Sequence, residues 1–179
     1  AKLENFVKIL LSSIEPFTLS LSDVDLNGIL NDCIKDLEPL VSSKNIRLIN
    51  DFETDIPKIS ADRDRLSQSL DNIIKHSIIS TPDNENLFLS TFWLEDQILI
   101  TITHKADRIT ASDLDKFFFP HIENEMDKSL LDLPFSKIII HRHGGKIDLI
   151  REEGDVLIIK IKFPVRRQID AGNGELETY

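Results

Sequence analysis

The chain has a single cysteine, Cys33, among its 179 residues. One cysteine excludes an internal disulfide and any metal site built on cysteines. Cys33 lies on the apolar stripe of a predicted helix, so we interpret it as a buried structural thiol. The chain also has no apolar run that approaches the ~18 residues needed to span a bilayer. It begins at Ala1, without a methionine or a visible signal peptide, and we expect a fragment of a longer protein.

Positive charge is scarce as well. Lysine and arginine number 21 against 31 acidic residues, which gives a net charge of −10. An acidic surface argues against non-specific binding to nucleic acid or to an anionic membrane. Apolar residues make up 41% of the chain and charged residues 29%. This ordinary globular balance argues against disorder of the whole chain, and the length suffices for one domain with a full core.

Amphipathic spacing predicts helices in the ranges 2–14, 25–43, 62–80, 112–118 and 132–143. The first has a narrow, seam-like apolar stripe, which is typical of the end of a longer helix or of a dimer contact. Pro39 is expected to kink or end the second helix in its last turn. Asp62 and Asp64 suit the positive end of the third helix, and Asp132 is expected to cap the last one. Gly144-Gly145 ends that last helix.

Alternating apolar residues predict strands in the ranges 17–21, 46–52, 87–93, 97–103, 146–151 and 156–163. Residues 55–60, which include Pro57, are predicted to form a loop. Adjacent strands with helices between them favour an α+β two-layer sandwich over an alternating βαβ wrap. Residues 166–179 are polar and aperiodic, and we expect a disordered tail.

Three stretches together carry a family resemblance. The first is the helix from Asp62 to Pro82, with matching residues at Asp62, Arg65-Leu66, Gln68, Leu70, Asn72-Ile73-Ile74 and Thr81-Pro82. The second is Gln97–Thr103, followed by Asp113-Leu114 and Phe118-Phe119-Pro120. The third is Ile138–Ile147 with the closing Ile161–Pro164. In this order and spacing, they resemble the catalytic and ATP-binding domain of sensor histidine kinases, in the GHKL ATPase superfamily.

The resemblance implies a Bergerat-type fold over residues 15–165, with a mixed five-stranded sheet covered on one face by three helices. It implies an ATP pocket and, if the family activity persists, Mg²⁺. Residues 1–14 resemble the end of the dimerising, phosphoacceptor helical hairpin, although residues 1–20 contain no histidine. The implied partners are a response regulator, the chain's own upstream hairpin and a second copy in the parent protein. The implied location is cytoplasmic, with membrane attachment only through missing regions.

The helix that resembles the nucleotide-binding helix departs from the family on its pocket side. The family places a magnesium-binding asparagine where this chain has His76, and a phosphate-facing lysine where it has Ile79. Asn72 keeps an earlier asparagine. These three positions share one helical face. Magnesium prefers hard oxygen ligands, whereas an imidazole nitrogen suits zinc or copper better.

Two further loops depart in the same way. The family's Asp-x-Gly-x-Gly turn, whose aspartate accepts the adenine amino group, aligns with His104, Ala106 and Arg108. Side chains with a Cβ disfavour the positive φ and the close backbone approach that glycine allows. The family's Gly-x-Gly-Leu-Gly-Leu segment aligns with residues 128–133, where Leu130 and Asp132 replace glycines. At close range, Asp132 would repel a triphosphate by a few kcal/mol, a rough magnitude for a surface-like dielectric.

Each of these residues also has an interpretation without a binding role. We favour His76 and His104 as solvent-exposed polar residues of a vestigial cleft, over a transition-metal site formed across it. His143 matches a family His-Gly-Gly feature that ends a helix. Lys105, with Lys128 and Arg108, forms either a basic anion site or ordinary exposed salt bridges. We assign no catalytic residue and no metal ligand.

Three functions remain open. The first is a pseudokinase domain that keeps the fold, has lost ATP and works as a scaffold or docking platform. The second is an active histidine kinase domain with an atypical pocket, which uses ATP and Mg²⁺ to phosphorylate a histidine on the upstream hairpin. The third is a binding module for another small ligand in the old pocket. Fold alone does not decide among them, because function depends on the site.

Overall fold

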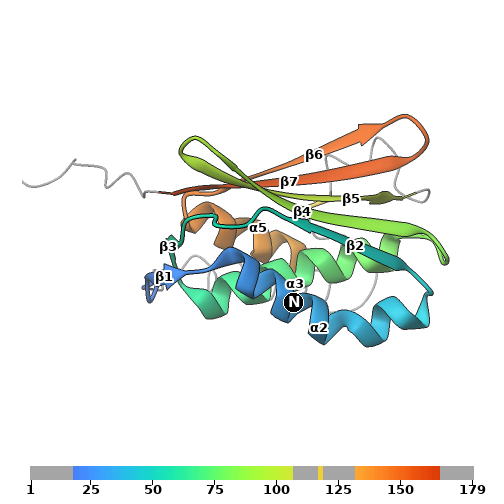
Figure 1. Cartoon of the computed structure of the whole chain (residues 1–179), viewed down its shortest axis with the longest axis horizontal. Helices are drawn as coiled ribbons and strands as arrows, with labels where there is room; N and C mark the ends of the chain where they lie inside the picture. Colours follow the sequence, from blue (N-terminus) through green and yellow to red (C-terminus); the bar gives the residue numbers. More distant parts are fainter. Residues whose placement is uncertain (1–17, 107–116, 119–131, 166–179) are drawn as a thin grey trace, which may run out of the picture.

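The computed structural model describes residues 18–106, 117–118 and 132–165, which form two layers (Figure 1). One layer is a five-stranded sheet in the order β2-β4-β5-β7-β6. The other consists of the helices α2 (Leu26–Ser43), α3 (Arg63–Ser80) and α5 (Asp132–Arg142), which cover one face of the sheet. The predicted α+β sandwich, with a mixed five-stranded sheet and three helices on one face, is confirmed.

The sheet is mixed because its edge strand β2 runs parallel to β4, while the other neighbours are antiparallel. Its strands are β2 (Arg47–Phe52), β4 (Asn86–Leu94), β5 (Gln97–Lys105), β6 (Lys146–Glu152) and β7 (Val156–Pro164). Each overlaps a strand predicted from alternation, with ends that differ by at most two residues. A period of two is a clear signal where one face of a strand is buried.

A second, two-stranded sheet corrects two predictions. It pairs β1 (Ser22–Val24) with β3 (Ile59–Ala61) in antiparallel fashion. The strand expected at 17–21 therefore lies further along the chain, and the loop expected at 55–60 ends in a strand. The pairing of Val24 with Ile59 explains the difference, because both side chains are buried in the core. Sequence alternation over three residues is too short to reveal such a strand.

The core lies between the sheet and the helices. On β5 and β7, alternate residues point toward the helices and are almost fully buried: Ile98, Ile100, Ile102, Leu157, Ile159, Ile161 and Phe163. The matching face of α3 contributes Leu66, Leu70, Ile73, Ile74 and Ile78, each with 0% exposure. This packing fixes the rotation of α3 about its axis. It therefore also fixes the direction in which the residues on the other side of the helix point.

Of the two outcomes expected at Pro39, a kink or an early end of α2, the early end is not observed. The helix continues for four more residues to Ser43. Proline removes one helical hydrogen bond and crowds the preceding turn. Leu40 and Val41, which follow it, pack against the core. The burial of these two side chains offsets the cost of the proline.

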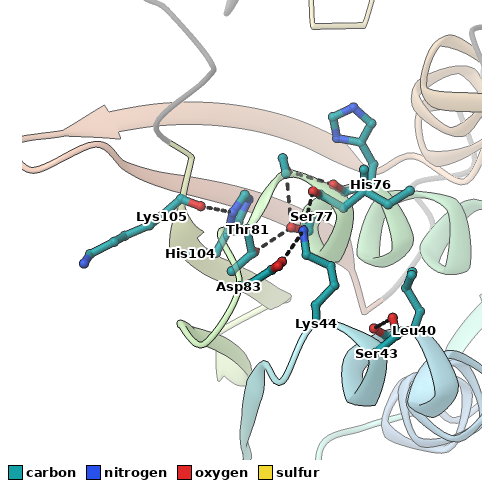
Figure 2. Close-up of polar contacts among 11 residues, drawn as sticks. Leu40, Ser43, Lys44, His76, Ser77, Thr81, Asp83, His104 and Lys105 are labelled. Atoms are coloured by element: carbon teal, nitrogen blue, oxygen red, sulfur yellow. Dashed lines mark hydrogen bonds and ion pairs between the residues drawn. The ribbon is translucent and has the colours of Figure 1, made fainter.

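Both ends of α3 are held by other parts of the chain. At its N-terminus, the Asp62 carboxylate accepts hydrogen bonds from the backbone N–H groups of Arg65 (3.2 Å) and Ser20 (3.0 Å). At its C-terminus, the Lys44 ammonium donates to the Ile79 carbonyl at 2.8 Å and pairs with Asp83 at 3.6 Å (Figure 2). The last turn of α3 contains no basic residue of its own. Lys44 therefore supplies the positive charge that the negative end of the helix dipole favours.

His143 connects α5 to the start of α3. Its Nδ1 lies 2.7 Å from the Ile139 carbonyl, and its Nε2 lies 3.0 Å from the backbone nitrogen of Asp62. A carbonyl only accepts, so Nδ1 carries the proton and Nε2 accepts the Asp62 N–H. His143 is only 4% exposed. The His-Gly-Gly segment thus ends α5, as predicted, and also joins it to α3, which was not predicted.

Gly145 provides a test of packing at this junction. A Cβ at Gly145 would lie 2.8 Å from two ring carbons of Phe163 and 2.9 Å from Ile140. We expect Gly145→Ala to lower the free energy of unfolding by about 1–3 kcal/mol, because the Phe163 ring is fully buried and cannot move aside. Urea unfolding followed by circular dichroism measures the change.

Gly28→Ala is the matched control. For a Cβ at Gly28, inside α2, the three nearest atoms all belong to the flexible side chain of Asp25, the closest at 3.2 Å. Alanine is the better helix former, so this variant should be neutral or more stable by up to about 1 kcal/mol. Equal stability of the two variants would contradict the packing account.

Candidate functional site

The pocket positions that the resemblance identifies on α3 and β5 come together at one end of the fold. α3 packs against β5, and Figure 2 shows His76 on the helix near the end of β5, where His104 lies. Asn72 and Ile79 lie about one turn before and one turn after His76 on α3. Ala106 follows β5 directly. Arg108 and Leu130 lie outside the described residues, and so does Lys128.

His104 occupies the last core-facing position of β5. It continues the buried row of alternate isoleucines on that strand and is only 2% exposed. Its Nδ1 lies 2.9 Å from the Lys105 carbonyl, so Nδ1 carries the proton and Nε2 carries a lone pair. Nε2 is buried and has no hydrogen-bond partner among the residues that the structure describes. The expectation that His104 is solvent-exposed is therefore wrong.

His76 is half-buried, so the same expectation is only partly right for it. Its Nδ1 is buried and also lacks a hydrogen-bond partner within the described ranges. Its ring meets the edge of Phe117, with centroids 4.9 Å apart and planes at 77°. Phe117 packs in the same way on Phe118 at 5.1 Å, and the Lys137 ammonium lies 5.2 Å from the Phe118 ring. His76 thus contacts an aromatic cluster.

Burial keeps both imidazoles neutral. Desolvation lowers the pKa of His76 below its ordinary value of 6.5. Desolvation likewise lowers the pKa of His104 from 6.5 to about 4, with an opposing effect of the Lys105 carbonyl and a further decrease caused by His76. A charged imidazole is disfavoured in such an environment. At neutral pH, these two positions therefore present nitrogen lone pairs or N–H groups, and no charge.

This donor set does not fit a magnesium nucleotide in the family's manner. Mg²⁺ requires hard oxygen ligands in an octahedral shell, and a neutral imidazole is a poor substitute. Asn72, which is half-buried, retains an amide oxygen. Among the described residues, no group of three or more His, Cys, Asp or Glu side chains could hold a metal ion.

The remaining positions also differ from a phosphate cradle. Ile79 is 55% exposed, where the family has a lysine. Ala106 is 1% exposed, and its N–H already donates to the Asp155 carbonyl at 2.8 Å. Asp132 lies in the first turn of α5, where the backbone N–H groups of the helix point outward. Its carboxylate therefore brings negative charge to the helix end that would attract a phosphate.

Two features of the site were missed in the sequence. Phe117 is part of a visible three-phenylalanine run, yet nothing in its spacing indicates contact with His76. The bond from Ala106 to Asp155 joins residues far apart in the chain. By contrast, the salt-bridge interpretation of Lys105 is confirmed, because its ammonium lies 2.6 Å from the Glu85 carboxylate.

Comparison with known proteins identifies the family of this fold. Residues 61–167, more than half of the chain, match the family described as "Histidine kinase-, DNA gyrase B-, and HSP90-like ATPase". The chain therefore belongs to this family. Together with its relatives, the match identifies it as a histidine kinase ATP-binding domain of the sensor kinases, as the resemblance implied.

The curated relatives are longer sensor kinases. The chain is 27% identical over 164 residues to sensor histidine kinase ZraS of Escherichia coli K12, covering 92% of this chain and 35% of ZraS. It is 26% identical over 170 residues to sporulation kinase E of Bacillus subtilis 168, covering 94% of this chain and 23% of that kinase. The chain thus spans about a third or less of these relatives.

Solved structures support the fold. The catalytic domain of histidine kinase ThkA, free of nucleotide, superposes with a TM-score of 0.70 at 20% identity, covering 82% of this chain and 97% of ThkA. Acinetobacter baumannii histidine kinase AdeS gives a TM-score of 0.73 at 19% identity, covering 92% and 77%. Within the described part of the chain, no helix is long and apolar enough to cross a membrane.

The buried His104 predicts a dependence of stability on pH. An unfolded chain protonates His104 near pH 6.5, whereas the folded chain does so only near pH 4. Below pH 6.5, the unfolded state binds more protons, so the stability due to neutral His104 is complete above pH 6.5 and is lost as the pH falls toward 4. The two pKa values differ by about 2.5, which is worth about 3 kcal/mol. The pKa of His76 is also lowered by burial, so His76 likewise makes the folded state less stable as the pH falls.

Urea unfolding at pH 7.0, 5.5 and 4.5 in buffer with EDTA measures this dependence. We expect His104→Gln to lose less stability between pH 7.0 and 4.5 than the unmodified chain. His141→Gln, at an exposed histidine, should keep the full loss. Identical pH profiles for the His104 variant and the unmodified chain would show that His104 is not buried in its neutral form.

Proposed function

We propose that this chain is the ATPase-like domain of a two-component sensor histidine kinase in which binding of Mg-ATP is impaired or absent. Its role is then to support signalling as a scaffold or docking platform. The observation that carries this proposal is the state of His76 and His104. Both are neutral, desolvated imidazoles at the positions where the family places its magnesium ligand and its adenine acceptor.

Magnesium binding is the first difficulty. The pocket offers the Asn72 amide as an oxygen ligand, while His76 offers nitrogen and packs against Phe117. Water would have to supply the remaining ligands. Because phosphoryl transfer depends on a metal that bridges the phosphates and neutralises their charge, loss of one ligand position weakens both binding and catalysis.

Charge at the phosphate end is the second difficulty. Ile79 removes a cation from the α3 face, and Asp132 adds an anion at the start of α5. The nearby lysines Lys44 and Lys105 are held by Asp83 and Glu85. A triphosphate would therefore meet repulsion from Asp132 without a compensating charge from these two side chains.

The proposed partners follow from the family. ThkA has been solved in complex with response regulator protein TrrA, and its superposition gives a TM-score of 0.72 at 22% identity. By likeness, we assign a response regulator as one partner of this chain, and an upstream helical hairpin, of which residues 1–14 are the end, as another. In the parent protein, that hairpin would form a homodimer, with this domain in the cytoplasm.

An active kinase is the competing function, and one observation favours it. The locked tautomer of His104 presents Nε2 as an acceptor, which is the hydrogen-bonding role of the aspartate that it replaces. Asn72 is also retained, and ATP binding is the common property of the family. Under this alternative, the chain binds Mg-ATP with an imidazole as the adenine acceptor.

A thermal unfolding titration separates the two functions. A ligand that binds only the native state raises its stability by about 2.7 kcal/mol at a hundred times its Kd. We expect 5 mM Mg-ATP to leave the Tm unchanged, because neither the metal nor the phosphates find their usual ligands. Asn72→Ala, measured beside the unmodified chain, should give the same result. A rise in Tm that Asn72→Ala abolishes would favour the active kinase and overturn the proposal.

A further inference from the structure

Strand β6 forms one edge of the five-stranded sheet, and no described strand lies beyond it (Figure 1). Its seven residues, Lys146–Glu152, pair on one side with β7. On the other side, alternate backbone N–H and C=O groups have no strand partner within the described part of the chain. β6 contains no proline that would block pairing. An open edge of this kind is able to pair with a strand of another chain.

The charges along β6 are unbalanced at both ends of the strand. Alternate residues face away from the helices: Lys146, Asp148, Ile150 and Glu152. Across the β6–β7 pair, Lys146 lies opposite Lys162, and like charges in directly opposite positions destabilise a sheet. Glu152 lies opposite the apolar Val156. Neither Lys146 nor Glu152 makes an ion pair with another described residue. Each end of β6 thus lacks an opposite charge.

We propose that β6 of a second copy of this chain pairs with β6 in antiparallel fashion, around a two-fold axis that passes through Leu149 perpendicular to the sheet. The two sheets then form one continuous sheet, with the helices of both copies on the same face. Lys146 and Glu152 are equally far from Leu149, on either side of it. Lys146 of each copy therefore lies opposite the second copy's Glu152. The edge is self-complementary, as a two-fold interface requires.

The charges also select this register over its neighbours. Charged side chains at an edge usually prevent pairing. A displacement by two residues in one direction places Asp148 opposite the second copy's Asp148, and in the other direction opposite the second copy's Glu152. A displacement by one residue exchanges the two faces of the strand. Only the register around Leu149 pairs all seven residues and sets opposite charges against each other, and repulsion in the competing registers makes such a contact specific.

Asp148 does not oppose this register. It lies opposite the second copy's Ile150, and it keeps Lys160 of β7 as its neighbour on the other side. The two Asp148 side chains of a dimer lie diagonally across the axis, each beside a lysine of its own copy. Their mutual repulsion is therefore offset within each copy.

The contact is that of a weak dimer. An antiparallel pair of this length exchanges about six to eight backbone hydrogen bonds. On the helix side, Leu149, which is half-buried and packed against the core, meets its counterpart at the axis. One strand from each copy buries less surface than a standard interface, so the dimer should dissociate on dilution. This inference is independent of nucleotide binding and differs from the homodimer expected through residues 1–14.

Sedimentation velocity of charge-reversal variants over a range of concentrations tests the pairing. Glu152→Lys places a lysine opposite the second copy's Lys146, and the two-fold axis produces this repulsion twice in each dimer. We expect it to raise the Kd of the dimer about tenfold or more. Lys146→Glu should also weaken the dimer, because it sets two glutamates against each other. The double variant Lys146→Glu/Glu152→Lys restores opposite charges and should return the Kd to within about threefold of the unmodified chain.

Glu38→Lys and Lys35→Glu are the matched controls. They make the same changes in net charge at exposed positions of α2, which lies away from β6 (Figure 1). Both should leave the Kd of the dimer unchanged. Circular dichroism shows that each variant is folded before its association is measured.

Cross-linking with a short bismaleimide tests the register directly. A mixture of Lys146→Cys and Glu152→Cys proteins should give a covalent dimer, because residues directly opposite in an antiparallel pair have Cα atoms about 5 Å apart. Either variant alone should not, since the two copies of one end residue lie about 20 Å apart along the paired strands. The native Cys33 is buried, and burial raises its pKa to about 11, so it should not react.

The proposal is overturned if the unmodified chain is a monomer at every concentration. It is also overturned if folded Glu152→Lys protein associates as tightly as the unmodified chain, because the contact then uses another surface, such as residues 1–14. A folded double variant that associates no better than Glu152→Lys alone, or a mixture of the two cysteine variants that cross-links no more than either alone, would show that β6 does not pair around Leu149.

Discussion

The junction between α5 and α3 depends on the hydrogen bond between His143 and the backbone of Asp62. It joins residues 81 positions apart in the chain and is buried. Through Nδ1, the same ring is fixed to Ile139 in α5. The Asp62 carboxylate in turn accepts hydrogen bonds from the N–H groups of Arg65, in the first turn of α3, and of Ser20, which precedes β1. One neutral histidine thus sets the position of α5 against α3, and a buried donor at Asp62 would otherwise lack this acceptor.

Because α3 is fixed at its start by Asp62, at its end by Lys44 and along its length by the core, its outward face has a fixed position whatever residues occupy it. This separation would allow residues of the proposed pocket to change while the fold persists. The apolar side of α3 matches the family, whereas His76 and Ile79 on the other side do not. Replacing such residues leaves the core intact, so the ligand that the pocket accepts is free to change.

Much of the fold could be predicted from the sequence, because long amphipathic helices and half-buried strands have clear periods. The short β1–β3 pair escaped prediction, since three residues give no period, and Pro39 was overridden by packing of Leu40 and Val41. The resemblance assigned residues to a nucleotide pocket, which stays a prediction, and it did not predict their burial. The burial of His104, the contact of His76 with Phe117 and the role of His143 all depend on long-range contacts that no local pattern contains.

The central claim is that the family fold is kept while the pocket no longer accepts Mg-ATP. The most direct measurement is a ¹⁵N-labelled NMR titration with Mg²⁺ and a non-hydrolysable ATP analogue, observed at individual backbone amides. The account predicts a well-dispersed spectrum in which the amides of Asn72, His76 and Ala106 do not shift. Saturable shifts confined to those amides would contradict it and would show that the pocket still binds nucleotide.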